Sequence, residues 1–149
     1  MNGYANKVRV FGMAPSAKVF FGEVRLAYSG VSARLGFVGP EENLDVVPAA
    51  TYRGDGLVYE VCLDWRAGDV DTWVDFRSDA YLFHVGLEAL ALSLEIVEKR
   101  GGISYSARNL KQMKNSLEGQ AAYVDLVHPI IAAGEVERLM VEAGAQRFG

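Results

Sequence analysis

A strict alternation of side chains over residues 57–65 constrains the fold more than any other feature of the sequence. It follows the turn sequence Gly54-Asp55-Gly56, and every second residue in it is large and apolar. Because successive side chains of a strand point to opposite faces of a sheet, the run predicts a strand with one buried face. The turn predicts that residues 49–53 form its antiparallel partner. The apolar residues are Leu57, Tyr59, Val61, Leu63 and Trp65.

Residues 18–38 predict a second hairpin, with two strands joined at Ser29-Gly30. If Tyr28 pairs with Val31, the large apolar side chains of both strands share one face of the hairpin. Residues 7–11 alternate in the same way, whereas Pro48 cannot lie in a central strand because it lacks a backbone N–H. The first 65 residues therefore predict an antiparallel sheet of about four or five strands.

The most apolar stretch predicts a long helix over residues 79–100, which Ser78 caps and Gly101-Gly102 stops. Apolar side chains occupy two sides of this helix and leave a narrow polar stripe. The sheet can cover one side, so either C-terminal helices or another copy of the protein must cover the other. The side chains of this second flank, which predict an oligomer interface, are Leu82, Val85, Ala89, Leu92 and Ile96.

Two further helices are expected, over residues 106–118 and 134–143, while residues 121–127 fit a helix or a strand. The predicted fold class is α+β, with an N-terminal antiparallel sheet packed on the long helix and the C-terminal helices. The length suits a single domain. Its expected parts are residues 1–65, mainly strands; 66–78, an acidic loop with tryptophans; 79–144, mainly helices; and 145–149, a tail.

Composition and charge exclude several classes of protein. Half of the 149 residues are apolar and 23% are charged, so the chain is expected to fold rather than stay disordered. The net charge is −4, but residues 1–40 carry five basic and one acidic side chain, which leaves −8 on the remainder. This balance argues against nucleic-acid binding, and it permits head-to-tail contact between copies.

The sequence gives no sign of export or of a membrane partner. Its first residues carry neither the apolar segment of a secretion signal nor a myristoylation motif, so a cytoplasmic location is expected, alone or in a particle assembled there. The apolar stretch at residues 80–97 is interrupted by His84, Glu88 and Glu95, which a lipid-facing helix would have to bury.

No set of residues predicts catalysis. Cys62, the single cysteine, lies within a predicted strand, far along the chain from either histidine, and is expected to be a structural thiol. No serine stands in a nucleophile motif, and no glycine-rich phosphate loop occurs. The expectation is therefore a protein without enzymatic activity and without a cofactor.

Two pairs of residues have the spacing of metal ligands. His84 and Glu88 are four apart on the predicted helix, and Asp125 and His128 are three apart. Each is a single pair, whereas metal centres built on helices recruit several such residues, so hydrogen-bonded histidines are expected and no metal is predicted.

The segment from residue 64 to residue 75 concentrates carboxylates beside both tryptophans of the chain. Such a segment can hold a cation or stack a ring-shaped ligand, and it is the first place to look for a ligand or a partner. The plainer interpretation is a solvated loop that its tryptophans anchor to the sheet. The residues are Asp64, Trp65, Asp69, Asp71, Trp73 and Asp75.

Three hypotheses for function stay open. The first is a structural or assembly subunit, without enzymatic activity, that acts through self-association and contact with other protein subunits. Its most specific form is an accessory protein of a bacteriophage head, neck or tail, by analogy with small α+β subunits. The second is a small-molecule-binding or enzymatic domain, whose pocket lies between sheet and helix near the acidic segment and Tyr59. The third is a monomeric regulatory adaptor with one exposed apolar patch.

Overall fold

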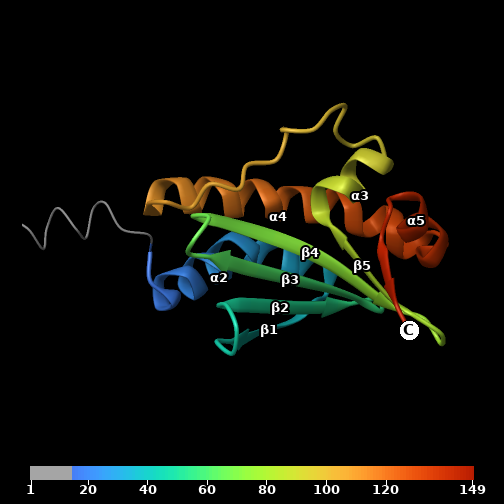
Figure 1. Cartoon of the computed structure of the whole chain (residues 1–149), viewed down its shortest axis with the longest axis horizontal. Helices are drawn as coiled ribbons and strands as arrows, with labels where there is room; N and C mark the ends of the chain where they lie inside the picture. Colours follow the sequence, from blue (N-terminus) through green and yellow to red (C-terminus); the bar gives the residue numbers. More distant parts are fainter. Residues whose placement is uncertain (1–14) are drawn as a thin grey trace, which may run out of the picture.

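A six-stranded antiparallel sheet is the centre of the computed structural model, which describes residues 15–149 (Figure 1). Neighbouring strands follow chain order throughout the sheet. The α+β class predicted from sequence is confirmed, with six strands rather than four or five, and the strand expected at residues 7–11 lies outside the described residues. The strands are β1 (Val38–Asn43), β2 (Ala49–Gly54), β3 (Leu57–Asp64), β4 (Asp69–Arg77), β5 (Leu82–Gly86) and β6 (Gln146–Phe148).

Two long helices, α2 (Ala17–Leu35) and α4 (Leu110–Ala133), pack against one face of the sheet and against each other. Figure 1 shows α2 behind the strands and α4 along their upper side. Two short helices, α3 (Leu87–Ser93) and α5 (Val136–Glu142), pack against β5. None of the helices in residues 15–149 is long and apolar enough to cross a membrane.

The core lies between the sheet and the long helices. The alternation predicted at residues 57–65 is confirmed over β3: four core-facing side chains are fully buried, and those between them are partly exposed. The prediction is wrong for Trp65, which lies beyond the strand and is half exposed. The predicted hairpin partner is also confirmed, since β2 pairs with β3 across the turn at Asp55. The fully buried residues of β3 are Leu57, Tyr59, Val61 and Leu63, which share the core with Phe20, Val24, Tyr28, Met113, Leu117 and Val124 of the helices.

The hairpin predicted over residues 18–38 is wrong, because residues 17–35 form the single helix α2. Ser16 caps its start, accepting a hydrogen bond from the Val19 amide, and Gly36 ends it with a positive φ of 69°. Side chains three and four residues apart form a buried stripe on this helix, which is the helical period. The stripe consists of Phe20, Phe21, Val24, Tyr28 and Val31.

The long helix predicted over residues 79–100 is also wrong. Residues 82–86 form β5, which pairs with β4, and only residues 87–93 are helical. The acidic loop expected at residues 66–78 is in large part strand β4. Because β4 and β5 supply half-buried strands on which the core is built, pairing with neighbouring strands overrides the helical propensity of the segment.

The C-terminal third differs mainly in where its elements end. The helix expected to end at Gly119 continues to Ala133, so the ambiguous residues 121–127 are helical. The last helix, expected at 134–143, is α5. The predicted tail at 145–149 contains β6, which pairs with β5 and completes the sheet.

Candidate functional site

The face of the sheet opposite α2 and α4 is here called the open face. The side chains of β4 alternate about the sheet, so Val70, Thr72 and Val74 are buried and the residues between them lie on the open face. Carboxylates dominate this face at β3 and β4, and the arginines are fewer. The acidic side chains are Glu60, Asp64, Asp69, Asp71 and Asp75, and the basic ones on β2 and β4 are Arg53 and Arg77.

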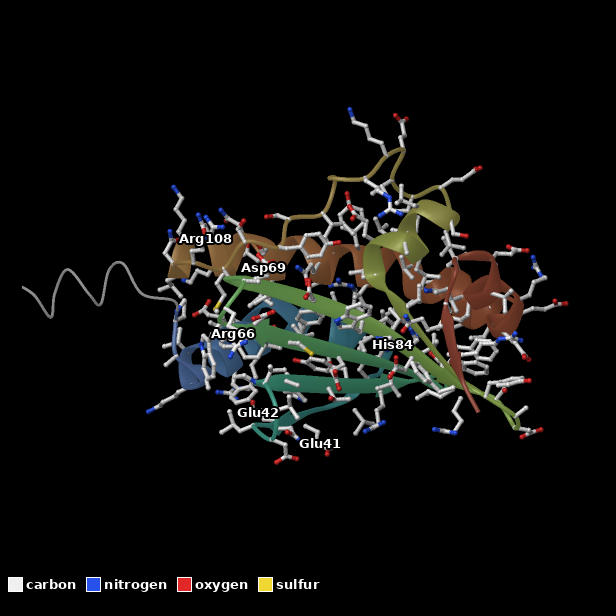
Figure 2. All side chains as sticks on the ribbon, viewed as in Figure 1. Glu41, Glu42, Arg66, Asp69, His84 and Arg108 are labelled. Atoms are coloured by element: carbon white, nitrogen blue, oxygen red, sulfur yellow. The ribbon has the colours of Figure 1, made fainter. Side chains whose placement is uncertain are left out.

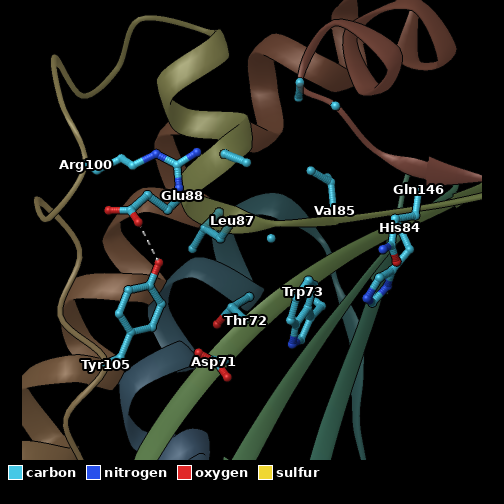
Figure 3. Close-up of a pocket in the computed structure, with 14 residues that line it drawn as sticks. Asp71, Thr72, Trp73, His84, Val85, Leu87, Glu88, Arg100, Tyr105 and Gln146 are labelled. Carbon is cyan, nitrogen blue, oxygen red and sulfur yellow. Dashed lines mark hydrogen bonds between the residues drawn. The ribbon is translucent and has the colours of Figure 1, made fainter.

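A cleft of about 390 Å³ lies where the sheet meets α3, the loop after α3 and the connection from α5 to β6 (Figure 3). This volume is in the range of small-ligand pockets. Its sheet side comes from β4 and β5, and its outer side comes from α3 and from residues 100 and 105 of the loop. Side chains on both sides are Asp71, Trp73, His84, Glu88, Tyr105 and Gln146.

An aromatic stack forms the sheet side of the cleft. The rings of Trp73 and His84 lie 4.5 Å apart between centroids and only 13° from parallel. Asp75, on the same face of β4, also holds the imidazole, with its Oδ1 2.5 Å from Nδ1 of His84. Gly86 lies directly opposite Trp73 in the next strand, where an added Cβ would make an ordinary van der Waals contact with the indole, 3.7 Å from Cζ3.

The outer side of the cleft is fixed by one carboxylate. Oε1 of Glu88 accepts a hydrogen bond from the Tyr105 hydroxyl at 3.1 Å, and Oε2 accepts one from the Gly101 amide at 3.0 Å. Both contacts join α3 to the loop between α3 and α4, so they hold the loop over the sheet. Burial, with the nearby charge of Glu88, raises the pKa of the Tyr105 phenol, so Tyr105 stays a hydrogen-bond donor at neutral pH.

A buried chain of hydrogen bonds also positions this loop. Gln120 of α4 is fully buried, and its Nε2 donates to the carbonyl oxygens of Val70 and Ser104, each at 2.9 Å. Its Oε1 accepts from the Thr72 hydroxyl at 2.8 Å. Because the single proton of Thr72 is used in this way, the Tyr28 hydroxyl donates to Thr72 Oγ1, also at 2.8 Å. One side chain thereby links helix, strand and loop.

Asp71 is the carboxylate of the cleft that lies on the sheet. Burial, followed by the like charges of Asp69 and Asp64, raises the pKa of its carboxyl group above the ordinary value. Ionised Asp71 is therefore an unfavourable charge in the protein alone, and a cation placed beside it would relieve that cost.

The thiol of Cys62 lies on the open face one strand away, opposite Asp71. Its Sγ donates to Oε1 of Glu60 at 3.2 Å. Burial, and this hydrogen bond to a carboxylate, raise the pKa of Cys62 well above its ordinary value. Such a thiol stays protonated at neutral pH, which is the opposite of what a nucleophilic cysteine requires.

The structure brings four of the six predicted ligand or partner residues together. Asp69, Asp71, Trp73 and Asp75 alternate on one face of β4, although the segment is a strand and not a loop. Asp64 ends β3, and its Oδ1 accepts from the Arg66 and Ala67 amides of the β3–β4 turn. Trp65 is half exposed and points elsewhere, because its Nε1 donates to the Pro15 carbonyl. Tyr59, expected in the same pocket, is buried on the opposite face.

The five residues predicted as one oligomer-forming flank do not share a face. Leu82 and Val85 belong to β5, and Val85 is buried in the core. Ala89 and Leu92 lie on α3, and Ile96 lies in the loop that follows it; all three pack against the core. The flank was inferred from a helix that does not form, so this basis for an interface is lost.

Neither predicted metal-ligand pair forms a centre. His84 is on β5 and contacts Asp75, while Glu88 is on α3 and contacts Tyr105. Asp125 forms an ion pair with Arg34 at 2.9 Å, and His128 contacts Tyr59 and Asp55 instead. No group of three or more potential metal-ligating side chains occurs within residues 15–149.

Sequence reasoning missed the outer side of the cleft. Tyr105 and Glu88 are 17 residues apart, and the helix predicted at 79–100 placed Glu88 in a polar stripe rather than beside a loop. On the sheet side, the sequence does contain a signal for a strand. Every second position is occupied by Asp69, Asp71, Trp73 or Asp75, and a period of two residues is typical of a strand. Comparisons of the chain with protein-family models, curated proteins and solved structures gave no match.

Proposed function

We propose that the protein is a binding subunit without enzymatic activity, which acts by contact between its open face and another protein chain. The observation that carries the proposal is the asymmetry of the fold: α2 and α4 cover one face of the sheet, and the other presents aromatic and acidic side chains. Aromatic groups surrounded by polar ones are typical of surfaces at which proteins dock.

The charges favour a particular kind of partner. Two open faces placed against each other would bring like carboxylates together, which disfavours a symmetric dimer through this surface. The partner therefore presents a basic surface, whether it is a second copy docked head-to-tail or a different protein. The most specific form of the proposal is an accessory subunit of a bacteriophage head, neck or tail, in which the partner is a neighbouring subunit.

A second function has one observation in its favour. The cleft of about 390 Å³ has an aromatic side and a carboxylate, Asp71, whose pKa is raised, and both are features expected of a small-molecule site. The same cleft opens on the face proposed for protein docking, so one experiment must separate the two.

Carboxyl footprinting separates them. Carboxylates are labelled with a carbodiimide and an amine, and mass spectrometry compares the purified chain, alone and at high concentration, with the chain in extract from cells that naturally make it. We expect protection of Glu60, Asp69 and Asp71, with unchanged labelling of Asp79 and Glu137, which are exposed residues of the β4–β5 turn and of α5.

Size fractionation of the extract identifies the ligand class. Protection by the high-molecular-mass fraction supports the proposal, and so does protection of the purified chain at high concentration, which indicates contact between copies. Protection by the low-molecular-mass filtrate alone transfers the function to a small molecule. If the labelling of Glu60, Asp69 and Asp71 changes no more between conditions than that of Asp79 and Glu137, the proposal is overturned.

A further inference from the structure

Most polar groups in the cleft already have partners within the protein. Both oxygens of Glu88 accept hydrogen bonds, and Asp75 is bound to His84. Asp71 differs, because none of the ion pairs among residues 15–149 includes it, and burial and the like charges of Asp69 and Asp64 raise its pKa. Within residues 15–149, the cleft therefore contains one carboxylate that has no ion-pair partner.

The nearby arginines lie toward either end of the site rather than at Asp71. Figure 3 shows Arg100 beyond Glu88, on the side away from Asp71. Figure 2 shows Arg66 and Arg108 near Asp69, at the start of β4, and a Cβ added at Gly68 would lie 2.8 Å from Cγ of Arg108. Positive charge thus lies beyond Glu88 and at the start of β4, and the carboxylate of Asp71 lies between the two.

The middle of the cleft also carries the aromatic stack. Trp73 follows Asp71 by two residues on the same face of β4, so the indole and the carboxylate lie side by side (Figure 3). A carboxylate beside an indole suits a cation on an apolar stem, because the charge is attracted by both groups and the stem packs on the ring. The Tyr105 oxygen, which donates its proton to Glu88, keeps a lone pair that accepts a hydrogen bond.

We propose that this cleft receives one basic side chain, arginine or lysine, from the partner protein, with its charged group at Asp71 and its stem against Trp73. The inference rests on the proposed function, and it names the chemistry by which the open face recognises that partner. A tethered side chain is favoured over a free cation because Glu60, Asp69 and Asp75 continue the acidic surface around the cleft and attract a basic segment as a whole.

The test uses the full chain labelled with ¹⁵N and observed by NMR. The probes are arginine and lysine blocked as acetyl and methylamide derivatives, with blocked citrulline as the neutral analogue of nearly the same shape, all at constant ionic strength. We expect saturable shifts at the Trp73 indole and at the amides of residues 71–73, 84–88 and 105 with at least one of the two cations, and none with citrulline.

Three variants make the result specific. Asp71→Asn keeps the shape of the side chain and should weaken binding by about tenfold or more, the factor expected for one charge-assisted hydrogen bond. Asp79→Asn removes an equal charge from an exposed loop and should leave binding unchanged. Trp73→Leu provides a second loss-of-binding variant that retains Asp71. Variant spectra verify that each fold is intact.

The outcomes separate this inference from the proposed function. Absence of cation binding, equal binding of citrulline, or unchanged binding by Asp71→Asn would each overturn the inference. If footprinting nevertheless shows protection by a macromolecule, the proposed function stands and the partner uses other contacts. If footprinting shows no protection, the proposed function itself fails, whatever the probes do.

Discussion

The hydroxyl oxygen of Tyr59 lies 2.7 Å from Nδ1 of His128, inside the layer between the sheet and α4. The other ring nitrogen, Nε2, lies 2.7 Å from Oδ2 of Asp55 in the β2–β3 turn. The imidazole is 1% exposed, and its ring meets Phe37 edge-on at 4.8 Å. These contacts resemble a catalytic relay in composition, but they face the core and connect a turn to a helix, so their role is structural.

His128→Ala should therefore destabilise the protein strongly. It leaves the buried Tyr59 hydroxyl without a partner and opens a cavity in the core, which together cost about 3 kcal/mol of unfolding free energy. Urea denaturation measures the change. Asp55→Asn is the matched control: its side chain is 59% exposed and asparagine tolerates the left-handed φ of 52°, so a loss below about 1 kcal/mol is expected. Equal losses in the two variants would refute this ranking.

Gln120→Leu should loosen the loop that forms the outer side of the cleft. The change leaves the Thr72 hydroxyl and the carbonyl groups of Val70 and Ser104 without their partner, with an expected loss of about 2–4 kcal/mol. Hydrogen exchange should accelerate most around Ser104. Gln112→Leu, the same change at a less buried site of α4, should cost less than about 1 kcal/mol. Unchanged exchange near Ser104 in Gln120→Leu would show that other contacts hold the loop.

Asp71→Asn should stabilise the protein at neutral pH and leave its stability unchanged in strong acid. A raised carboxyl pKa means that the folded state binds its proton more tightly than the unfolded chain, so ionisation of Asp71 lowers stability as pH rises toward the raised pKa. The asparagine amide cannot ionise. The variant's gain in unfolding free energy over the wild type therefore grows between the carboxyl pKa of the unfolded chain and the raised pKa of the folded protein, and it is constant above the raised pKa. We expect less than about 1 kcal/mol at this half-exposed position, reduced further by salt. Denaturation curves across pH measure it, and a destabilised variant at neutral pH would contradict the assignment.

Cys62 should react slowly with thiol reagents in the folded protein. Burial and the contact with Glu60 raise its pKa, so the reactive thiolate is scarce at neutral pH. Alkylation by iodoacetamide at pH 7.5 should be at least about tenfold slower than in the urea-unfolded chain, as followed by mass spectrometry. Glu60→Gln should speed the reaction by removing the acceptor charge. Equal rates in folded and unfolded chains would mean that the thiol is an accessible nucleophile.

The sequence predicted the parts of the fold whose signals are local. β3 has a strict alternation, and the turn at Gly54-Asp55-Gly56 fixes its pairing with β2, so both were predicted correctly. α2 was mistaken for a hairpin because Ser29-Gly30 is typical of a tight turn and the apolar residues on either side also satisfy a two-residue alternation. The caps at Ser16 and Gly36 are the signals that identify the helix.

The candidate site was predictable only on its sheet side. The residues of β4 were singled out for their chemistry, yet the segment was taken for a loop because acidic residues are rare in strands. Whether residues 82–86 form a strand or a helix depends on the partner β4, which local propensity does not describe. With β5 assigned to a helix, the contact of Glu88 with Tyr105 could not be foreseen, since it needs the chain to turn back after α3.

The pairing of β6 with β5 is the one strand pairing of the described sheet that joins distant parts of the chain. β1 to β5 are joined by short turns, whereas the pairing of His84 with Gln146 closes a loop that contains α3, α4 and α5, and such non-local contacts form slowly. Gln146 is also part of the cleft wall. The wall of the proposed binding cleft therefore depends on a contact between strands far apart in the chain, and it is incomplete wherever β6 has not paired with β5.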